Sequence, residues 1–299
     1  MSAPPRRLLA RGRELELGPR PLLMGIVNAS PDSFSDQGGA GGVEEQVARG
    51  ERLLGDGADI IDVGGESAST GSPPVPVEEE IARVVPVIER LVGDLGALVS
   101  VDTYKPAVAS AAIEAGASIV NDVSGLRDPE LAAVCARTGA ALVVMHTAAA
   151  PRERRQESDL YGDIVAEVLA FLRERIEAAL AAGVEREQLI VDPGPDFAKT
   201  PAQTVRLLAG LGRLHELGRP LLLAISRKDF IGALTDRPPH ERLAGTLAAL
   251  AHGVHEGAHI VRLHDVDAAG DYLAVRAALA GEQVLDEELR LAEEIRHSR

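Results

Sequence analysis

Polar side chains of the kinds used in binding and catalysis recur along the 299-residue chain, each time near the end of a short apolar run. Carboxylates, amides and basic groups are costly to bury, and they gather where a protein binds a ligand or does chemistry. They are Asn28, Asp62, Glu66, Asp102, Asn121, Asp122, His146, Asp192, Ser226, Arg227, Lys228, Arg262, His264 and Asp265. If the fold brings them together, they predict one polar site, although a binding protein without catalytic activity would also have such a site.

The apolar runs predict the elements that position these side chains. Eight runs are short, continuous and rich in β-branched residues, which is typical of strands buried on both faces of a parallel sheet. They cover residues 21–28, 59–65, 97–103, 118–125, 141–147, 189–194, 221–227 and 259–265. The stretches between them carry apolar residues three and four positions apart and are predicted helices. Eight such pairs predict an α/β protein, a (β/α)8 TIM barrel, with the strand-end side chains at its C-terminal mouth.

A doubly wound sheet is the competing fold, and it would need a Gly-x-Gly-x-x-Gly phosphate loop after an early strand. The sequence has none, and the glycine-rich stretch 38–42 is interpreted as a loop rather than a phosphate-binding nest. Residues 1–20 are predicted to form a hairpin that caps the closed end of the barrel. Residues 21–282 are predicted to form the barrel as a single domain, and 283–299 a charged, solvated helix.

Composition and charge exclude several classes of protein. The net charge of −15 argues against a nucleic-acid-binding surface, which would need clustered Lys and Arg. No run of 18 apolar residues is free of charge, and the N-terminus lacks a signal-peptide pattern, so we expect a cytosolic protein with no membrane span. Aromatic residues make up only 2%, so recognition of a flat ligand must depend mainly on polar groups. The single cysteine, Cys135, excludes a disulfide framework and is expected to be a buried, inert thiol.

Structural interpretations compete with functional ones at some of the strand ends. Asp62 and Asp102 could simply pair with Arg227 or Lys228 and keep the barrel mouth neutral, because ion-pair networks also gather carboxylates. His146 could be a hydrogen-bonded structural histidine rather than part of a site.

Two further clusters are given structural interpretations. His252, His255 and His259 are close enough in sequence to suggest a metal site, but they fall at the closed end of the barrel, where a solvated cluster is expected. The acidic run 78–80 is interpreted as the first turn of a helix, favoured by the helix dipole.

Taken in chain order, the strand-end motifs resemble those of the dihydropteroate synthase family. They are MGIVNASPDSFSD, GADIIDVGGES, VSVDTYKPAVA, IVNDVSGLRDPEL, VMH, DPGPDFAKT, SRKDFIGAL and RLHDV. They follow the family's order from residue 22 to residue 266, and eight motifs in register make the resemblance specific. It implies a (β/α)8 barrel, usually a homodimer, that acts as a transferase in folate synthesis. Members of the family condense 6-hydroxymethyl-7,8-dihydropterin pyrophosphate with p-aminobenzoate, release pyrophosphate and use Mg²⁺.

The resemblance also implies roles for individual side chains. The pterin pocket would be formed by Asp102, Asn121, Asp122, Met145, Asp192, Phe197 and Lys228. Asn28 would bind Mg²⁺, Asp36 would reach in from the first loop, and Arg262 and His264 would bind the leaving pyrophosphate. Cleavage of the C–O bond to pyrophosphate would leave a cation delocalised into the pterin. Catalysis would then be positioning plus electrostatic stabilisation, without a covalent nucleophile.

Departures from the family concentrate where p-aminobenzoate would bind. The family usually has GGESTRPG and SRKSF, whereas this chain has GGESASTG and SRKDF, so Ser69 replaces an arginine and Asp229 replaces a serine expected near the aminobenzoate carboxylate. Two like charges about 4 Å apart repel by roughly 1 to 4 kcal/mol, so p-aminobenzoate could be used weakly or be replaced by another nucleophile. Alternatively, Arg152, Arg154 or Arg155 supplies the missing positive charge.

Three functions stay open at this stage. The favoured one is a transferase that makes dihydropteroate. The second is a pterin-binding paralogue, regulatory or accessory, with weak or no p-aminobenzoate use. The third, a methyltransferase that uses methyltetrahydrofolate, is disfavoured by the complete phosphate-binding set, because a methyl donor carries no pyrophosphate.

Overall fold

The computed structural model describes residues 6–29, 42–66 and 74–296, and these contain one parallel sheet of eight strands. The strands are β3 (Leu22–Asn28), β4 (Ile60–Gly64), β5 (Val99–Asp102), β6 (Ile119–Asp122), β7 (Ala141–Met145), β8 (Leu189–Asp192), β9 (Leu222–Ala224) and β10 (Ile260–Leu263). Their order is β8-β7-β6-β5-β4-β3-β10-β9, and a parallel bridge between Val191 and Leu221 joins the two ends. The predicted TIM barrel is confirmed, and each strand lies within a predicted run.

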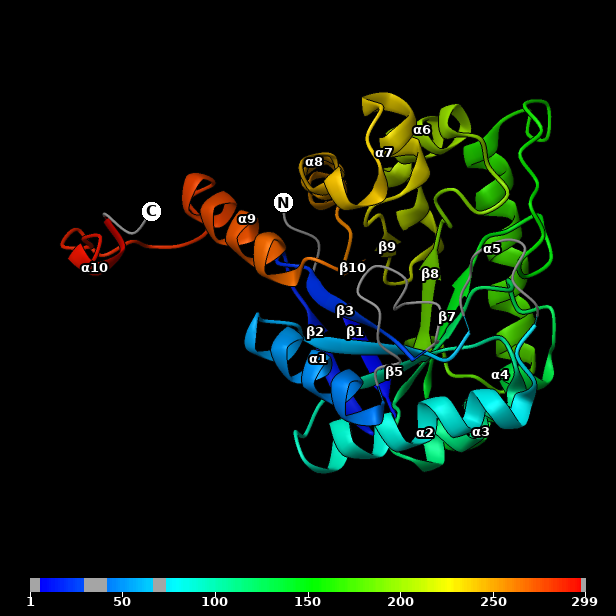
Figure 1. Ribbon diagram of the computed structural model, residues 1–299. Coiled ribbons are helices and arrows are strands. Elements are labelled where there is room, and N and C mark those ends of the chain that lie inside the picture. Colours follow the sequence, from blue (N-terminus) through cyan, green and yellow to red (C-terminus); the bar gives the residue numbers. More distant parts are fainter. Residues whose placement is uncertain (1–5, 30–41, 67–73, 297–299) are drawn as a thin grey trace.

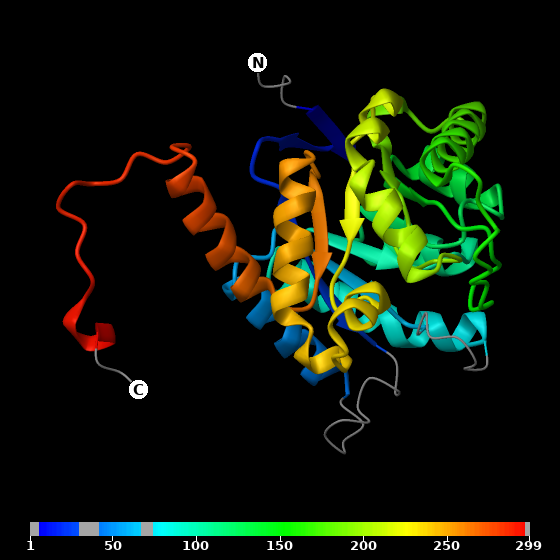
Figure 2. The ribbon, with the colours of Figure 1, turned by 90° about the horizontal axis from the view of Figure 1, so that it is seen from above.

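Helices surround this barrel, as Figures 1 and 2 show. They are α1 (Val43–Gly55), α2 (Val77–Gly93), α3 (Pro106–Glu114), α4 (Glu130–Thr138), α5 (Ile164–Ala181), α6 (Pro201–Ala209), α7 (Asp229–Thr235), α8 (Leu243–His255) and α9 (Val266–Leu279). The acidic first turn of α2 is present as predicted. One of its three carboxylates, that of Glu80, is also buried and accepts hydrogen bonds from Lys105 and Thr103.

The core has two parts, one between sheet and helices and one inside the barrel. The inner part is filled from the N-terminal halves of the strands, for example by Met24, Ile60 and Ile190. The antiparallel hairpin of β1 (Arg6–Ala10) and β2 (Arg13–Leu17) adds Leu8, Ala10 and Leu17 to it. The predicted cap at the closed end is therefore present, and it leaves the opposite end of the barrel free for polar groups.

The C-terminal segment differs from the prediction of a continuous helix over 283–299. Among the described residues of this segment only α10 (Glu293–Arg296) is helical, and in both ribbon views the chain after α9 runs away from the barrel. Val284 and Leu289 are 97% and 64% exposed. A short amphipathic segment without a surface to pack against is only marginally helical, which explains the difference.

His252, His255 and His259 do not form the solvated cluster that the sequence predicted. His252 Nε2 lies 2.7 Å from the carbonyl of Leu208, and His259 Nδ1 accepts a hydrogen bond from the backbone of Leu221. Only His255 is exposed. Within the described residues, no group of three or more His, Cys, Asp and Glu side chains could hold a metal ion, and no helix is long and apolar enough to cross a membrane.

Candidate active site

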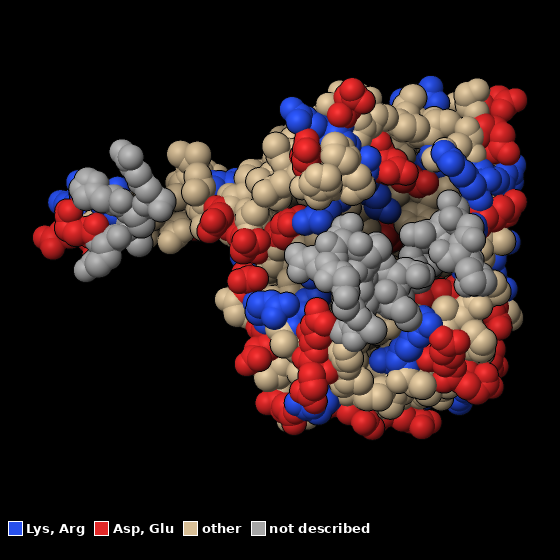
Figure 3. Space-filling model, in the orientation of Figure 1, with Lys and Arg blue, Asp and Glu red and all other residues tan. Residues whose placement is uncertain are grey.

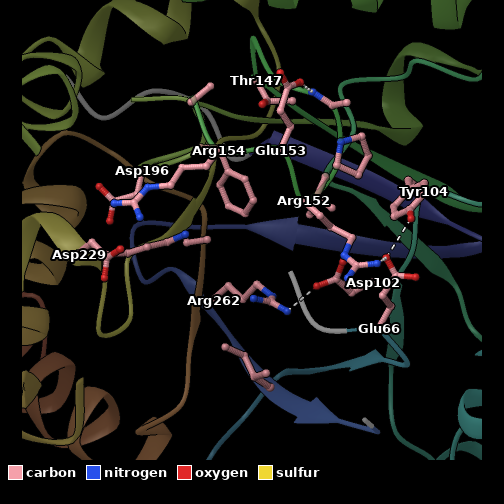
Figure 4. Close-up of a pocket in the computed structure, with 18 of the residues that line it drawn as sticks. Glu66, Asp102, Tyr104, Thr147, Arg152, Glu153, Arg154, Asp196, Asp229 and Arg262 are labelled. Carbon is pink, nitrogen blue, oxygen red and sulfur yellow. Dashed lines mark hydrogen bonds and ion pairs between the residues drawn. The ribbon is translucent and has the colours of Figure 1, made fainter. Parts of the chain in front are cut away.

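A cavity of about 580 Å³ opens at the C-terminal mouth of the barrel, where the sequence placed the site (Figure 4). Its wall combines strand ends with the segment after β7 and the start of α7. The predicted site residues that line it are Asn28, Asp102, Phe197, Lys228, Asp229, Arg262 and His264. On the face shown in Figure 3, acidic and basic side chains are interspersed.

Four predicted pterin residues lie at strand ends but do not line this cavity. They are Asn121, Asp122, Met145 and Asp192, and all are buried. Asp192 is beside Met145 in the sheet and accepts a hydrogen bond from the backbone of Gly194. Asp122 accepts hydrogen bonds from the backbone nitrogens of Ser124 and Leu126, so its carboxylate stabilises the turn after β6. Two predicted residues, Asp36 and Ser69, and the stretch 38–41 lie outside the described part of the chain.

Arg262 on β10 is the centre of the site's charge network. It donates to Oδ2 of Asp62 at 2.6 Å and to Oδ2 of Asp102 at 2.8 Å, and Asn121 donates to the same oxygen of Asp62 at 3.2 Å. Asp62 is fully buried, and Arg262 is 18% exposed. The structural alternative in which the two aspartates pair with Arg227 or Lys228 is not what the structure shows, because Arg262 is their partner and Arg227 pairs with Asp265 at 2.6 Å.

Burial perturbs two carboxylates of the site, Asp102 and Asp192. It raises the pKa of Asp102 to about 7, in spite of the opposing effect of Arg262. It likewise raises the pKa of Asp192 to about 6, against the hydrogen bond from Gly194 and the positive charge of Lys228. Both groups can therefore change protonation state near neutral pH.

His264 is a neutral member of the site rather than a cation. Burial, together with the charges of Arg262, Arg227 and Arg49, lowers its pKa to about 3. Its Nδ1 lies 2.9 Å from Ser226 Oγ, which also accepts a hydrogen bond from the His264 backbone nitrogen. The hydroxyl proton of Ser226 is then directed at Nδ1, which leaves Nε2 to carry a proton as a donor.

The opposite wall is a basic and aromatic platform. Lys228 Nζ lies 4.4 Å from the centre of the Phe197 ring, a cation–π distance, and burial lowers the pKa of this lysine. Asp196 joins the loop after β8 to α7 and α6, because its carboxylate accepts hydrogen bonds from the Phe230 backbone and the Thr204 hydroxyl. The DPGPDF loop thus holds Phe197 beside the cavity, as the sequence predicted.

Comparison with known proteins identifies the family. A family model described as pterin binding enzyme matches residues 24–264. The dihydropteroate synthase of Bacillus subtilis is 44% identical over 246 residues, which are 82% of this chain and 84% of that protein. The chain belongs to the dihydropteroate synthase family. The enzymes that give the family its name are transferases, so the predicted family and enzyme class are confirmed.

Solved dihydropteroate synthases share the fold over almost their whole length. The Xanthomonas albilineans enzyme with 4-aminobenzoic acid is 47% identical, with a TM-score of 0.84 over 92% of this chain and 98% of that chain. The same enzyme in complex with 7,8-dihydropteroate gives a TM-score of 0.82, with the same identity and coverage.

Several polar contacts at the cavity of this barrel were not predicted. Glu66 lines the cavity and binds Lys105 at 2.7 Å, Arg152 at 3.3 Å and the hydroxyl of Tyr104. Burial opposes the charge of Glu66, but the hydrogen bonds from Lys105, the Val75 backbone and Tyr104, with the charge of Lys105, together outweigh burial and lower the pKa of this carboxyl group. Glu66 was recognised only as a strand-end carboxylate, and its partners lie on other loops, so sequence spacing gave no signal for them.

Lys199 is a second residue that the sequence did not indicate, and its contact with His146 explains the role of that histidine. The fully buried Lys199 Nζ lies 2.9 Å from His146 Nδ1 and donates to the carbonyls of Gly194 and Phe197 at 2.8 and 2.9 Å. Burial, reinforced by the charge of Lys199, lowers the pKa of His146 to about 2. His146 is therefore neutral and structural, the second of its two sequence interpretations.

Asp229 does not present an uncompensated charge to the cavity. Its side chain is 75% exposed, and its Oδ1 accepts a hydrogen bond from Arg242 Nη1 at 3.1 Å. Solvent and this partner both screen the repulsion that the sequence predicted for an anionic ligand.

We therefore expect Asp229→Ser to lower the KM for p-aminobenzoate by only about threefold or less, since an exposed, paired charge contributes little. Steady-state kinetics at varied p-aminobenzoate would measure this, with Asp236→Ser as a control on an acidic residue at the other end of α7. A decrease of tenfold or more would show that the Arg242 pair does not screen Asp229 in solution.

Proposed function

We propose that this chain condenses 6-hydroxymethyl-7,8-dihydropterin pyrophosphate with p-aminobenzoate to give dihydropteroate and pyrophosphate. The observation that carries the proposal is the cavity, where buried carboxylates, an arginine and a lysine–phenylalanine platform converge in a chain 47% identical to an enzyme solved with 4-aminobenzoic acid and with 7,8-dihydropteroate. The paralogue without p-aminobenzoate use loses the support that Asp229 gave it, because Asp229 is screened by Arg242.

The pterin would be recognised by the carboxylates of Asp102 and Asp192. A dihydropterin edge carries N–H donors beside carbonyl and ring-nitrogen acceptors, so ionised Asp102 on the cavity wall can accept from it. A pterin that enters deeper than this cavity would also meet the buried Asp192, an acceptor, and Asn121, which offers both kinds of group. Asp192 has one oxygen bound to Gly194, which fixes the orientation of the other. Fixed acceptors select a flat polar ring without any need for aromatic stacking, in keeping with the scarcity of aromatic residues.

The pyrophosphate end would be bound by Arg262 and by the Nε2 proton of neutral His264. As the bond between the pterin methylene carbon and the pyrophosphate oxygen breaks, negative charge develops on the leaving group and positive charge on the pterin. Arg262 stabilises the first charge, and the carboxylate of Asp102, 2.8 Å from Arg262, lies near the second. The aromatic amine then forms a bond to the methylene carbon and loses a proton to solvent.

The described residues also fit Mg²⁺ bound mainly through its substrate. Asn28 lies at the exposed end of β3, and its amide oxygen is a hard ligand on the cavity wall. Mg²⁺ usually takes one or two protein oxygens and completes its shell with water and substrate phosphate. We propose that Asn28 holds the ion. When bound, Mg²⁺ would neutralise charge on the pyrophosphate.

The proposal is tested by incubating the purified protein with Mg²⁺ and pterin pyrophosphate, with and without p-aminobenzoate. We expect dihydropteroate to form and pyrophosphate to be released in equal amounts, and only with p-aminobenzoate present. Binding of pterin pyrophosphate without product at saturating p-aminobenzoate would instead identify a non-catalytic paralogue. The homodimer and the cytosolic location stay predictions from the sequence.

The two perturbed carboxylates predict a pH dependence of pterin recognition. If Asp102 and Asp192 must both be ionised, protonation as pH falls through about 7 and about 6 removes the acceptors. We expect kcat/KM for pterin pyrophosphate, which reports the free enzyme, to be about twentyfold lower at pH 6 than at pH 8.

Asp192→Asn is the matched variant. The wild type and the variant act on the same substrate, so the titration of its phosphates affects both pH profiles equally and cancels when the profiles are compared. The variant should be slower at every pH and should lose the steeper, lower part of the acid limb. An acid limb of unchanged steepness in Asp192→Asn would contradict the assignment of that ionisation to Asp192.

A further inference from the structure

Two departures from the family change the charge that this chain offers to the carboxylate of p-aminobenzoate. Ser69 stands where an arginine was expected, and Asp229 has brought an acid to the start of α7. Three arginines after β7 line the cavity and could replace the lost charge, and they are Arg152, Arg154 and Arg155. Their contacts in the structure differ enough to distinguish them.

Arg152 already forms an ion pair with Glu66. Its Nη1 lies 3.3 Å from Glu66 Oε1, and its side chain is only 10% exposed. Its Nε and Nη2 are unpartnered among the described residues, but both atoms are buried rather than open to a ligand. Glu66 and Glu80 together match the charges of Arg152 and Lys105, so this cluster has no net positive charge to offer.

Arg155 also has fixed partners. Its Nε lies 3.5 Å from Glu157 Oε2, and its Nη1 donates to the carbonyl of Ala148 at 3.4 Å. The carboxylate of Glu157 offsets its charge, and the contact with Ala148 directs one end of the guanidinium to the protein backbone. A substrate carboxylate would have to compete with both contacts.

Arg154 alone of the three has no acidic partner among the described residues. Its Nε and Nη2 donate to Oε1 of Gln156 at 3.3 and 3.1 Å, a neutral acceptor. Figure 4 shows its side chain extending across the cavity toward Asp196, on the side where Asp229 lies. Gln156 in turn reaches the carbonyl of Lys199, next to the loop of Phe197. The guanidinium is thus held from one side and keeps Nη1 available.

We propose that Arg154, oriented by Gln156, is the residue that binds the carboxylate of the second substrate in this chain. The inference rests on the proposed synthase function. An aminobenzoate ring on the Lys228–Phe197 platform would direct its amine toward the pterin methylene carbon and its carboxylate to the outer side of the cavity. A guanidinium with a free N–H edge binds a carboxylate by charge-assisted hydrogen bonds, and it acts here as a specificity-determining residue.

The test compares Arg154→Gln with Arg155→Gln, which removes the same charge from the same loop. Arg154→Gln should raise the KM for p-aminobenzoate about tenfold, whereas kcat and the KM for pterin pyrophosphate should stay within about twofold. Arg155→Gln should change the KM for p-aminobenzoate by about twofold or less, because it loses only the long-range charge. Salt should weaken p-aminobenzoate binding in the wild type more than in Arg154→Gln.

A neutral analogue, p-aminobenzamide, separates carboxylate recognition from a general loss of the site. The wild type should prefer the acid to the amide, and Arg154→Gln should lose most of that preference. Equal effects of the two arginine variants, or an unchanged preference for the acid in Arg154→Gln, would overturn the inference. A wild-type protein that forms no dihydropteroate would instead refute the proposed function, so the two failures can be told apart.

Discussion

Replacing Arg262 with methionine is expected to lower kcat/KM for pterin pyrophosphate by about a hundredfold to a thousandfold, and the free energy of unfolding by about 3 kcal/mol. The first effect follows because Arg262 is the cation that meets the leaving group. The second follows because Asp62 and Asp102 lose their shared partner, and Asp62 is fully buried with its Oδ1 already unpartnered among the described residues. Steady-state kinetics and urea denaturation measure the two effects separately.

A second substitution separates charge balance from catalysis. Arg262→Met combined with Asp62→Asn removes the orphaned buried carboxylate, so it should recover part of the lost stability but none of the turnover. Arg276→Gln, which breaks an exposed pair with Glu282, is the control and should change the free energy of unfolding by about 0.5 kcal/mol or less. Recovery of turnover in the double variant would show that Arg262 acts only by holding the two aspartates.

The Arg262 network also shows how far sequence could predict the site. The strand-end rule placed Asp102, Lys228, Arg262 and His264 at one barrel mouth, because strand ends of a closed parallel barrel must converge. It could not assign partners, since the contact of Arg262 with Asp62 joins residues 200 positions apart and depends on barrel closure. The alternative that the aspartates pair with Arg227 or Lys228 was chemically reasonable, but the structure gives them Arg262 as their partner.

Residues outside the strand ends were harder to predict. Glu80 and Lys105 lie at the starts of helices, where the sequence indicates only that an acidic turn suits the helix dipole. The burial of Glu80 and its contact with Lys105 depend on the packing of α2 against β5 and α3. The prediction of a helix over residues 283–299 was wrong for the opposite reason. The local pattern is helical, but the segment has no surface to pack against. Local periodicity therefore predicted the barrel elements well, whereas contacts made through loops required the assembled fold.

Lys199→Met is expected to lower the free energy of unfolding by about 2 to 4 kcal/mol, because carbonyl groups of a tight loop lose their donor. Lys199 Nζ binds the carbonyls of Gly194 and Phe197 and the ring of His146, and methionine can replace its methylene chain but none of these bonds. The loop around Phe197 should also become less ordered. We therefore expect a several-fold rise in the KM for p-aminobenzoate, together with faster hydrogen exchange over residues 194–199.

The pH dependence of this effect identifies its cause. Burial lowers the pKa of Lys199 to about 7 in the folded protein, against about 10.4 in an unfolded chain. A lowered pKa means that the folded state binds the proton less well, so the stability due to Lys199 is fully present above about pH 10 and declines as pH falls toward about 7. The difference in unfolding free energy between wild type and Lys199→Met should shrink over the same interval.

Tyr161→Phe provides the matched control, because its hydroxyl donates one hydrogen bond to the same loop, at the carbonyl of Ala198. It should cost about 1 kcal/mol with little dependence on pH below about 9, since burial raises the pKa of this tyrosine to about 12. A pH-independent deficit in Lys199→Met, equal to that of Tyr161→Phe, would mean that the loop needs only an ordinary hydrogen bond. A deficit that changes with pH would mean that the buried amine is the group that sets the position of Phe197 and, through its ring, of Lys228.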